Sequence, residues 1–404
     1  MQPGVVIVGG GQAGLEAAAA LRTLGYDGTV TLICEEVHAP YQRPPLSKDF
    51  LTGKQQQDSV FLRALVYYEK HRIDLILGDR VTEINRGGRL VHLAGGGTVA
   101  YEQLILAVGA RNRALPVPGA ENVLYLRSLD EAVTLRQRLA EARQSVVVIG
   151  GGFIGLEVAA AGRGAGKQVT VIEAAPRLMA RAVSPLLSDF FLDVHRGQGV
   201  NVMLNSAVLE VRPDCVTLTG GRRIEADVVV AGIGVVPNVE LARDAGLDVD
   251  DGITVDEFLR TSDVDIFAIG DCAHHPNFFA GARARLESVQ NAVDQAKCVA
   301  RAIMGNSTPY RDVPWFWTDQ YDIRFQMVGL AAGYDQSVVR GSAESRKFSA
   351  FYFKEGRLLA VDSVNRLSDH LAARKMLAAG TALTPEQAGD ETVDLKKLIT
   401  LDHA

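Results

Sequence analysis

The sequence has few of the features by which several classes of protein are recognised. Its 404 residues include only four cysteines, and no two of them stand at the spacing of a zinc knuckle, a cluster motif or a redox dithiol (Cys34, Cys215, Cys272 and Cys298). We expect four separate thiols in a reducing compartment. No apolar stretch is long enough to cross a bilayer. A membrane-spanning protein and a local metal site are therefore not expected.

The chain also has fewer positively than negatively charged residues. The chain has 42 lysines and arginines against 48 aspartates and glutamates, a net charge of -6. This balance argues against general binding to nucleic acid or to an anionic membrane. No basic segment precedes the apolar run at residues 5–8, so we expect no signal peptide and a cytoplasmic location. With 47% hydrophobic and 22% charged residues, the chain has the composition of a globular protein of two or three domains.

One pattern occurs twice. At residues 5–14 and 146–155, a short β-branched run ends in a cluster of glycines. An Ala-rich helical stretch follows each time, and then a second strand. The periodicity places the helices at residues 15–24 and 156–165 and the second strands at residues 29–34 and 168–172. A strand–turn–helix–strand unit of this kind builds a parallel sheet, so the repeat predicts two dinucleotide-binding domains.

The two glycine clusters have the G-x-G-x-x-G spacing. In this motif the first glycine permits a tight turn, the second lets the backbone approach a pyrophosphate, and the third lets helix and strand pack closely. The phosphates then meet the free N–H groups and positive dipole end of the helix. The glycines that fit these roles are Gly9, Gly11 and Gly14 in the first copy and Gly150, Gly152 and Gly155 in the second.

A carboxylate follows each second strand. We expect Glu35 and Glu173 to accept a hydrogen bond from a ribose 2′-hydroxyl. Because a carboxylate repels a 2′-phosphate, Glu173 favours NADH over NADPH. Arg177 and Arg181 lie just beyond Glu173 and weaken this inference, since they could instead meet the pyrophosphate or a neighbouring carboxylate.

The chain order predicts that the second domain is inserted into the first. Strands expected at residues 103–108 and 227–233 leave the two domains, and a strand at 266–269 returns to the first. From about Pro314 the pattern changes to antiparallel strands at residues 325–328, 348–353 and 358–361, with a helix at 368–377 and an acidic, poorly patterned tail from Thr384. The predicted fold is α/β, with two Rossmann-like domains and a C-terminal α+β domain.

A third segment connects the chain to a known family. Residues 261–271, which close with Gly270-Asp271, resemble the second FAD motif of the glutathione-reductase-like flavoproteins. Within that superfamily the whole chain resembles the ferredoxin reductases of bacterial oxygenase and cytochrome P450 systems, the putidaredoxin reductase type. The markers of this type lie at residues 43–48, 125–129, 150–157, 231–238, 287–292 and 314–321.

The resemblance implies a function, two cofactors and their sites. It implies a reductase that takes electrons from NADH through FAD to a [2Fe-2S] ferredoxin, which supplies a cytochrome P450 or Rieske-type oxygenase. FAD would occupy residues 1–112 and 238–313, NAD would occupy 113–237, and 314–404 would form the C-terminal domain. The residues implied to line FAD are Ala13, Glu35, Arg43, Lys48, Val81, Arg127, Asp271, Val289 and Trp317. Those implied to line NAD are Gly152, Ile154, Glu173, Arg181 and Gly234.

Four features have expected roles in hydride transfer. Lys48 is expected near N5 of the flavin, where a cation favours the arrival of negative charge. Glu157, at the start of the helix after the second glycine turn, is expected to pair with Lys48 and to touch the nicotinamide amide; it could instead be a first-turn carboxylate that the helix dipole stabilises. A helix at residues 288–303 would direct its positive end at the flavin. Trp317 is expected to flank the flavin ring, whereas Trp315 is equally well explained as a core aromatic.

Two alternatives remain. A disulfide reductase needs a dithiol near the flavin, and residues 40–48 contain no cysteine. A redox-sensing protein like apoptosis-inducing factor would bind both cofactors and turn over slowly.

A ferredoxin is usually acidic, so a basic docking patch is expected. The candidates are Lys354, Arg357, Arg366, Arg374 and Lys375 in the C-terminal domain, with Arg63, Lys70 and Arg72 opposite.

Overall fold

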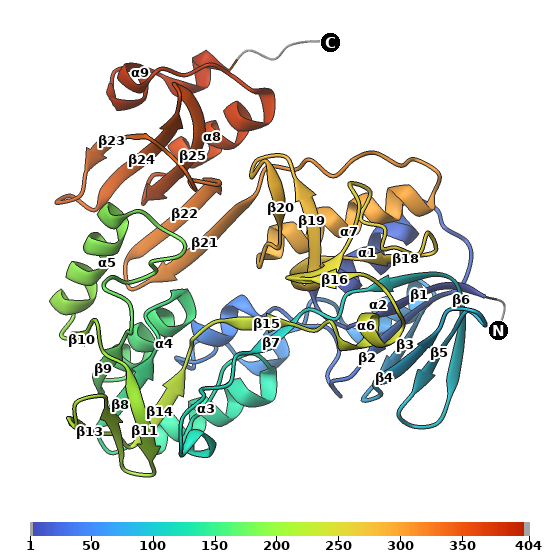
Figure 1. Ribbon diagram of the computed structural model, residues 1–404, viewed down its shortest axis with the longest axis horizontal. Coiled ribbons are helices and arrows are strands. Elements are labelled where there is room, and N and C mark those ends of the chain that lie inside the picture. Colours follow the sequence, from blue (N-terminus) through green and yellow to red (C-terminus); the bar gives the residue numbers. More distant parts are fainter. Residues whose placement is uncertain (1–2, 400–404) are drawn as a thin grey trace.

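The computed structural model describes residues 3–399 and arranges them around three principal sheets (Figure 1). In that view the sheet that begins at the N-terminus lies on the right, a second parallel sheet at the lower left, and the C-terminal sheet at the upper left. None of the helices among the described residues combines the length and apolar character needed to cross a membrane.

The β-branched run before the first glycine turn forms the centre of a largely parallel sheet. Its strand pairs in parallel on both sides, and the predicted strand at residues 266–269 joins the same sheet, as expected. The parallel strands, in spatial order, are β3 (Ile73–Leu77), β2 (Val30–Cys34), β1 (Gly4–Val8), β6 (Thr98–Leu106) and β18 (Ile266–Ala268). An antiparallel extension from β6 comprises β5 (Leu90–Leu93) and β4 (Val81–Asn85).

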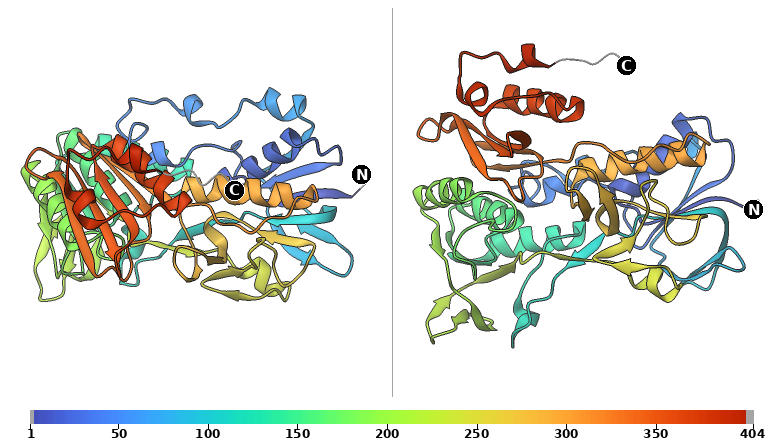
Figure 2. Two further views of the ribbon diagram at one scale, coloured as in Figure 1. Left: turned by 90° about the horizontal axis from the view of Figure 1, so that it is seen from above. Right: turned by 45° about the horizontal axis from the view of Figure 1, so that its top comes forward.

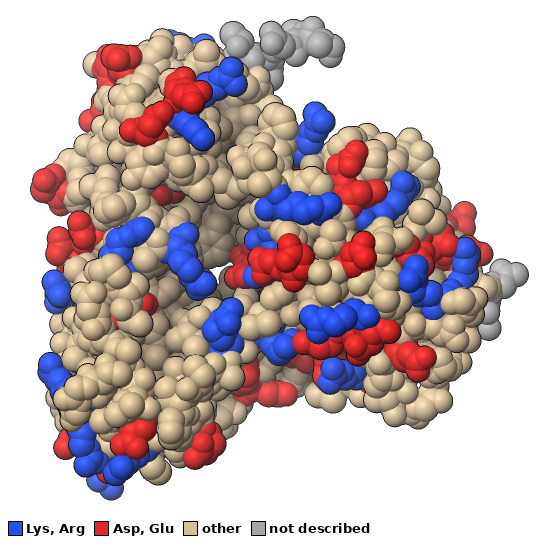
Figure 3. Space-filling view, in the orientation of Figure 1, with Lys and Arg blue, Asp and Glu red and all other residues tan. Residues whose placement is uncertain are grey.

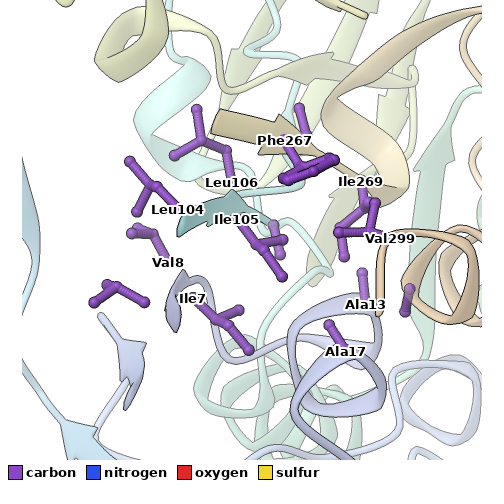
Figure 4. Close-up of a cluster of buried hydrophobic side chains, with 14 of the residues drawn as sticks. Ile7, Val8, Ala13, Ala17, Leu104, Ile105, Leu106, Phe267, Ile269 and Val299 are labelled. Carbon is purple, nitrogen blue, oxygen red and sulfur yellow. The ribbon is translucent and has the colours of Figure 1, made fainter. Parts of the chain in front are cut away.

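Two helices pack together over this sheet and position the first glycine turn. They are α1 (Gln12–Thr23) and α7 (Val289–Ile303). Figure 4 shows the small side chains of Ala13 and Ala17 on α1 beside the apolar side chains of the central strands. Alanine at these positions allows close approach, so the buried core holds the start of α1 against the end of β1.

The second glycine turn belongs to a smaller parallel sheet. Its strands, in spatial order, are β10 (Asn201–Met203), β9 (Gln168–Ile172), β8 (Ser145–Ile149) and β14 (Val228–Ala231). The helices of this part are α3 (Leu129–Glu141), α4 (Phe153–Gly164) and α5 (Pro185–Gly197), and a small antiparallel sheet comprises β11 (Val208–Arg212), β12 (Cys215–Leu218) and β13 (Arg223–Glu225).

Two antiparallel segments, β7 (Ala110–Asn112) and β15 (Val235–Pro237), connect this part to the first sheet (Figures 1 and 2). The chain therefore leaves the first part and returns to it along one ribbon, which confirms the inserted arrangement. The remaining elements of the first part are α2 (Leu65–Lys70), α6 (Glu240–Asp244), β16 (Val249–Asp250), β17 (Gly252–Thr254), β19 (Ala273–Asn277) and β20 (Ala282–Ala284). The short 3-10 helices are η1 (Pro44–Ser47), η2 (Gln57–Val60), η3 (Ala120–Asn122), η4 (Gly270–Cys272) and η5 (Leu395–Leu398).

The C-terminal sheet is antiparallel and contains the strands expected at residues 325–328, 348–353 and 358–361. Its spatial order is β21 (Trp315–Gln320), β22 (Ile323–Gly329), β25 (Arg357–Val364), β24 (Lys347–Lys354) and β23 (Gln336–Ser342). The helices α8 (Leu367–Ala379) and α9 (Pro385–Gly389) pack against it, and β21 also contacts α4. The predicted α+β character of this part is thus confirmed.

Two sequence expectations differ from the structure. The helices predicted to begin at residues 15 and 156 begin three residues earlier, directly after Gly11 and Gly152, because these glycines are the N-cap residues. From residue 384 to residue 399 the tail is also better ordered than its pattern indicated, and residues 400–404 lie outside the described part of the chain. The tail starts α9 with a capping box, and the buried guanidinium of Arg340 donates to the carbonyls of Asp390 and Val393.

Candidate active site

A cleft with a volume of about 2290 Å³ runs between the two glycine turns. Figure 3 shows the surface hollowed between the C-terminal sheet at the upper left and the first sheet at the right. Eighteen of the twenty residues expected to line a cofactor lie on the wall of this cleft: Gly9, Gly11, Ala13, Glu35, Arg43, Lys48, Val81, Arg127, Gly150, Gly152, Ile154, Glu157, Glu173, Arg181, Gly234, Asp271, Val289 and Trp317.

The other two predicted residues, Gly14 and Gly155, lie beneath the turns. A Cβ at Gly14 would be 2.0 Å from the carbonyl oxygen of Gly9, and one at Gly155 would be 2.1 Å from that of Gly150. These glycines therefore permit close packing of helix on strand, as the motif requires. Gly9 and Gly150 themselves have positive φ angles of 116° and 104°, which favour glycine.

The middle glycines face the cleft. A Cβ at Gly11 would meet no heavy atom within 4 Å, and one at Gly152 would meet only the carbonyl oxygen of Gly232 at 3.9 Å. The protein therefore leaves space above both turns, at the N-termini of α1 and α4. Glycine at these positions is explained by a ligand that must approach the backbone, and a dinucleotide pyrophosphate fits that requirement.

The two expected ribose carboxylates do not occupy matching positions. The N–H of Gly9 donates to Ile33 and that of Gly150 donates to Ile172, so Cys34 is the counterpart of Glu173. Glu35 lies one residue further along and has its side chain 69% exposed. The carboxylate of Glu173 instead accepts the N–H of Gly151 and that of Ala175, each at 2.7 Å, and so braces the second glycine turn.

Two arginines beyond Glu173 weakened the expectation of NADH binding, and both line the cleft. One of them, Arg177, has its guanidinium bound within the protein. Arg177 donates to the carbonyls of Val183 and Ala180, at 2.7 and 2.6 Å, and to the hydroxyl of Ser188. It is a structural residue. Arg181 stays on the cleft wall, and a Cβ at Gly234 would be 3.0 Å from its Nη2, which places both residues at one point of the second site.

Charged side chains around the first turn form a connected network. The guanidinium of Arg43 donates to the carboxylate of Glu36 at 3.0 Å and to the carbonyl of Arg127. Arg127 in turn pairs with Asp271 at 2.7 Å. Arg127 lines the cleft, and its Nε is buried without a hydrogen-bond partner in the protein. A polar ligand such as FAD would supply that partner, so the residues fit the cofactor.

The centre of the cleft contains an ion pair. The Nζ of Lys48 lies 2.7 Å from Oε1 of Glu157, whose side chain is only 1% exposed. The same carboxylate accepts hydrogen bonds from the hydroxyls of Ser47 and Thr318. Glu157 lies beyond the first turn of α4, so the interpretation as a first-turn carboxylate is wrong. Its charge is compensated by a cation and two hydroxyl donors.

Sequence reasoning did not identify Ser47 and Thr318 as partners of Glu157. Both residues lie within marker segments, but they are 110 and 161 residues away from Glu157 along the chain. No local spacing relates such distant positions. The motifs indicated that the segments matter, whereas η1, α4 and β21 had to pack together before the contact existed.

Aromatic residues form the C-terminal wall of the cleft. Trp317 and Trp315 have ring centroids 5.5 Å apart, and the guanidinium of Arg374 lies 4.5 Å from the ring centroid of Trp315. Trp315 also packs edge-on against His370 at 5.5 Å. Both tryptophans line the cleft, so Trp315 is a cleft residue that packs on the C-terminal helix α8 as well.

The cysteines offer no thiol chemistry at this cleft. All four are free and buried. Burial raises the pKa of Cys34 to about 12 and the pKa values of Cys272 and Cys298 to about 11. A thiolate is the reactive form of cysteine, so these three side chains are poor nucleophiles at neutral pH.

Comparison with known proteins agrees with this geometry. Residues 3–296 match the model of the family described as pyridine nucleotide-disulphide oxidoreductase. The chain belongs to this family. Residues 315–399 match a second family model, described as reductase C-terminal. Both matches agree with the fold described above.

Relatives within this oxidoreductase family match the chain from end to end. The chain is 52% identical over 402 residues to rhodocoxin reductase of Rhodococcus erythropolis, covering 98% of this chain and 94% of the relative. A ferredoxin reductase for the CYP199A2 system of Rhodopseudomonas palustris has a TM-score of 0.96 at 47% identity, covering 99% of this chain and 100% of that one. Putidaredoxin reductase in its covalent complex with putidaredoxin has a TM-score of 0.95 at 41% identity, covering 98% of each chain.

Proposed function

We propose that this flavoprotein takes electrons from NADH and passes them one at a time to a [2Fe-2S] ferredoxin, which supplies a cytochrome P450 or Rieske-type oxygenase. The observation that carries the proposal is the Lys48–Glu157 pair between two dinucleotide turns, in a cleft without a reactive thiol. When bound, FAD supplies the conversion between a two-electron donor and a one-electron acceptor. The relatives named above are a rhodocoxin reductase, a ferredoxin reductase and a putidaredoxin reductase bound to putidaredoxin, and these names favour electron transfer to a protein partner over slow redox sensing.

The proposed roles follow from where the side chains lie. Lys48 holds a positive charge at the flavin, and Glu157 orients Lys48 and accepts the nicotinamide amide. Asp271 and Arg127 hold the polar part of FAD, and Trp317 excludes solvent from the ring. The N-terminus of α7, capped by Ser288, directs its positive end toward the flavin. We propose residues 1–112 and 238–313 as the FAD domain, 113–237 as the NAD domain and 314–404 as the C-terminal domain.

The ferredoxin is proposed to dock beside Arg374. This guanidinium covers Trp315, next to the cleft, and can meet an acidic partner. The candidate Arg366 is less suited, because it already pairs with Asp369 at 2.7 Å and with Glu391. Arg374→Glu should slow ferredoxin reduction at low salt about ten-fold and leave flavin reduction by NADH unchanged. Arg222→Glu, at an exposed position in the β12–β13 turn and outside the candidate patch, is the matched control. An unchanged rate for Arg374→Glu would remove this position from the interface.

A cytoplasmic location is also proposed, because free buried cysteines are typical of proteins in a reducing compartment. The test of the function is reduction of cytochrome c by NADH, with and without candidate [2Fe-2S] ferredoxins. We expect a yellow protein whose cytochrome c reduction depends on a ferredoxin. A folded, colourless protein that cannot be reconstituted with FAD would contradict the proposal. Full activity without any ferredoxin would contradict the choice of acceptor.

A further inference from the structure

A chain of hydrogen bonds leads from Glu157, at the cleft, to His195 on α5. The hydroxyl of Thr318 donates to Oε1 of Glu157 at 2.5 Å, and Nε2 of Gln320 donates to that hydroxyl at 3.3 Å. Oε1 of Gln320 lies 2.9 Å from Nε2 of His195, and the hydroxyl of Tyr321 lies 3.3 Å from Nδ1 of His195. Glu157, Thr318, Gln320 and His195 are each at most 2% exposed.

In all these hydrogen bonds the donor lies farther from Glu157 than the acceptor does. The amide oxygen of Gln320 faces His195, so Nε2 of His195 carries the proton and Nδ1 accepts from Tyr321. Burial lowers the pKa of His195, which keeps the ring neutral with a single N–H. Thr318 accepts from the amide of Gln320, so its one O–H proton is directed at Glu157. Each donor in the chain therefore points toward the negative charge.

The participants come from different parts of the fold. His195 lies on α5 beside the second sheet, Gln320 and Thr318 lie on β21 of the C-terminal sheet, and Lys48 follows η1 of the first part. The interface between α5 and β21 thus extends the cleft's polar network away from any cofactor. Thr318 is the residue through which this extension is hydrogen-bonded to the Lys48–Glu157 pair.

We infer that His195 and Gln320 are positioning residues, which act through Thr318 on the Lys48–Glu157 pair. His195 sets the orientation of the Gln320 amide, and that orientation makes Thr318 donate to Glu157. A hydrogen bond to a buried carboxylate is strong because it is charge-assisted, so the chain stabilises the charge of Glu157. The inference rests on the proposed function, since it assumes that Lys48 and Glu157 face the flavin.

Removing the ring nitrogens of His195 has a defined consequence. The amide of Gln320 is then free to turn and present its oxygen to Thr318, whose single proton would go to Gln320 instead of Glu157. The negative charge of Glu157 would be less compensated, and addition of electrons next to it would become less favourable. His195→Phe should therefore make the midpoint potential of bound FAD more negative and slow flavin reduction by NADH on the order of ten-fold.

The experiment compares this variant with a rescue and an interface control. His195→Gln retains an N–H donor. It should restore most of the wild-type midpoint potential and most of the rate of flavin reduction. Tyr352→Phe removes a hydrogen bond of 2.8 Å to Ser184, which lies just before α5 at the same interface, and one of 2.9 Å to Asp362. Neither partner belongs to the chain of hydrogen bonds that reaches Glu157. Tyr352→Phe should change neither the potential nor the reduction rate. FAD content and unfolding temperature are measured for every variant.

A second pair of substitutions keeps the test decisive if His195→Phe does not fold. Thr318→Val removes the hydroxyl at nearly constant shape and should shift the potential in the same direction, whereas Thr318→Ser should not. If His195→Phe or Thr318→Val leaves the potential and rate unchanged while Lys48→Ala slows reduction, the inference is wrong and the proposed function stands. If Lys48→Ala has no effect either, the proposed roles of the pair fail. Equal slowing by His195→Phe and Tyr352→Phe would assign the effect to packing and overturn the inference.

Discussion

Cys34 occupies, beside the first glycine turn, the position that Glu173 occupies beside the second. The N–H of Gly9 donates to the carbonyl of Ile33, the residue before Cys34. The N–H of Gly150 donates in the same way to the carbonyl of Ile172, the residue before Glu173. A Cβ at Gly10 would be 2.3 Å from Sγ of Cys34, so the thiol fills the space under the first turn. At the second turn a charged carboxylate binds the N–H of Gly151 instead. The two repeats are thus alike in backbone and different in electrostatics.

We predict that Glu173 determines the preference for NADH. Glu173→Gln removes the charge that would repel a 2′-phosphate and should lower the ratio of kcat/KM for NADH to that for NADPH about ten-fold. Glu225→Gln, an exposed position on β13, should leave the ratio unchanged. Steady-state kinetics with both nucleotides measures the effect. If Glu173→Gln left the ratio of kcat/KM for NADH to that for NADPH unchanged, Glu173 would not determine the nucleotide preference.

A methyl group at Gly152 should weaken NADH binding and leave folding intact. The position is open, with its nearest atom at 3.9 Å, so Gly152→Ala should fold and keep FAD. Because the added Cβ occupies the approach to the helix N-terminus, the Kd for NADH should rise about ten-fold or more. Gly155→Ala is the contrasting variant, since its Cβ would meet a backbone oxygen at 2.1 Å and should impair folding. Nucleotide titration and thermal unfolding distinguish the two. Normal NADH affinity in Gly152→Ala would contradict the assignment.

Loss of the cation beside Glu157 should slow electron entry without loss of FAD. Lys48→Ala removes the positive charge from the cleft and should reduce the rate of flavin reduction by NADH about ten-fold or more. It also leaves a buried carboxylate unpaired, so stability should fall. The double variant Lys48→Ala with Glu157→Gln should regain stability but not the rate. Stopped-flow reduction at the wild-type rate in Lys48→Ala would show that the cation has no role in this step.

The stability of the C-terminal sheet should depend on pH through Asp362. Burial raises the pKa of this carboxyl to about 7, and the hydroxyl of Tyr352 lies 2.9 Å from its Oδ2. In the unfolded chain the same carboxyl releases its proton near pH 4. Between about pH 4 and pH 7 the folded protein therefore binds more protons from this group, and its contribution to stability declines as pH rises.

Above pH 7 this contribution should be constant. Asp362→Asn removes the titration, so its unfolding temperature should fall less than that of the wild type between pH 5 and 7. Thermal unfolding across this range, with Asp322→Asn as a surface control, measures the difference. Parallel curves for the wild type and Asp362→Asn would show that Asp362 does not titrate in this range.

Local signals accounted for most of the architecture. The glycine turns, the β-branched runs before them and the strand at residues 168–172 were predicted because each depends on neighbours within a few residues. The helices at Gln12 and Phe153 began earlier than periodicity indicated, because the N-cap glycines are set by the turn and not by an apolar stripe. The tail after Thr384 was underestimated, since the buried guanidinium of Arg340 holds it from a strand far away in the chain.

The sequence by itself determined that this protein has two dinucleotide turns, a carboxylate near each, and no dithiol between them. Tertiary structure alone decided which carboxylate serves which purpose. Glu157 is buried against Lys48 and Thr318, Glu173 braces a turn, and Glu35 stays exposed. The reason is physical: a carboxylate's function depends on burial and on the donors around it, and the hydroxyl donors to Glu157 come from segments more than 100 residues away in the chain.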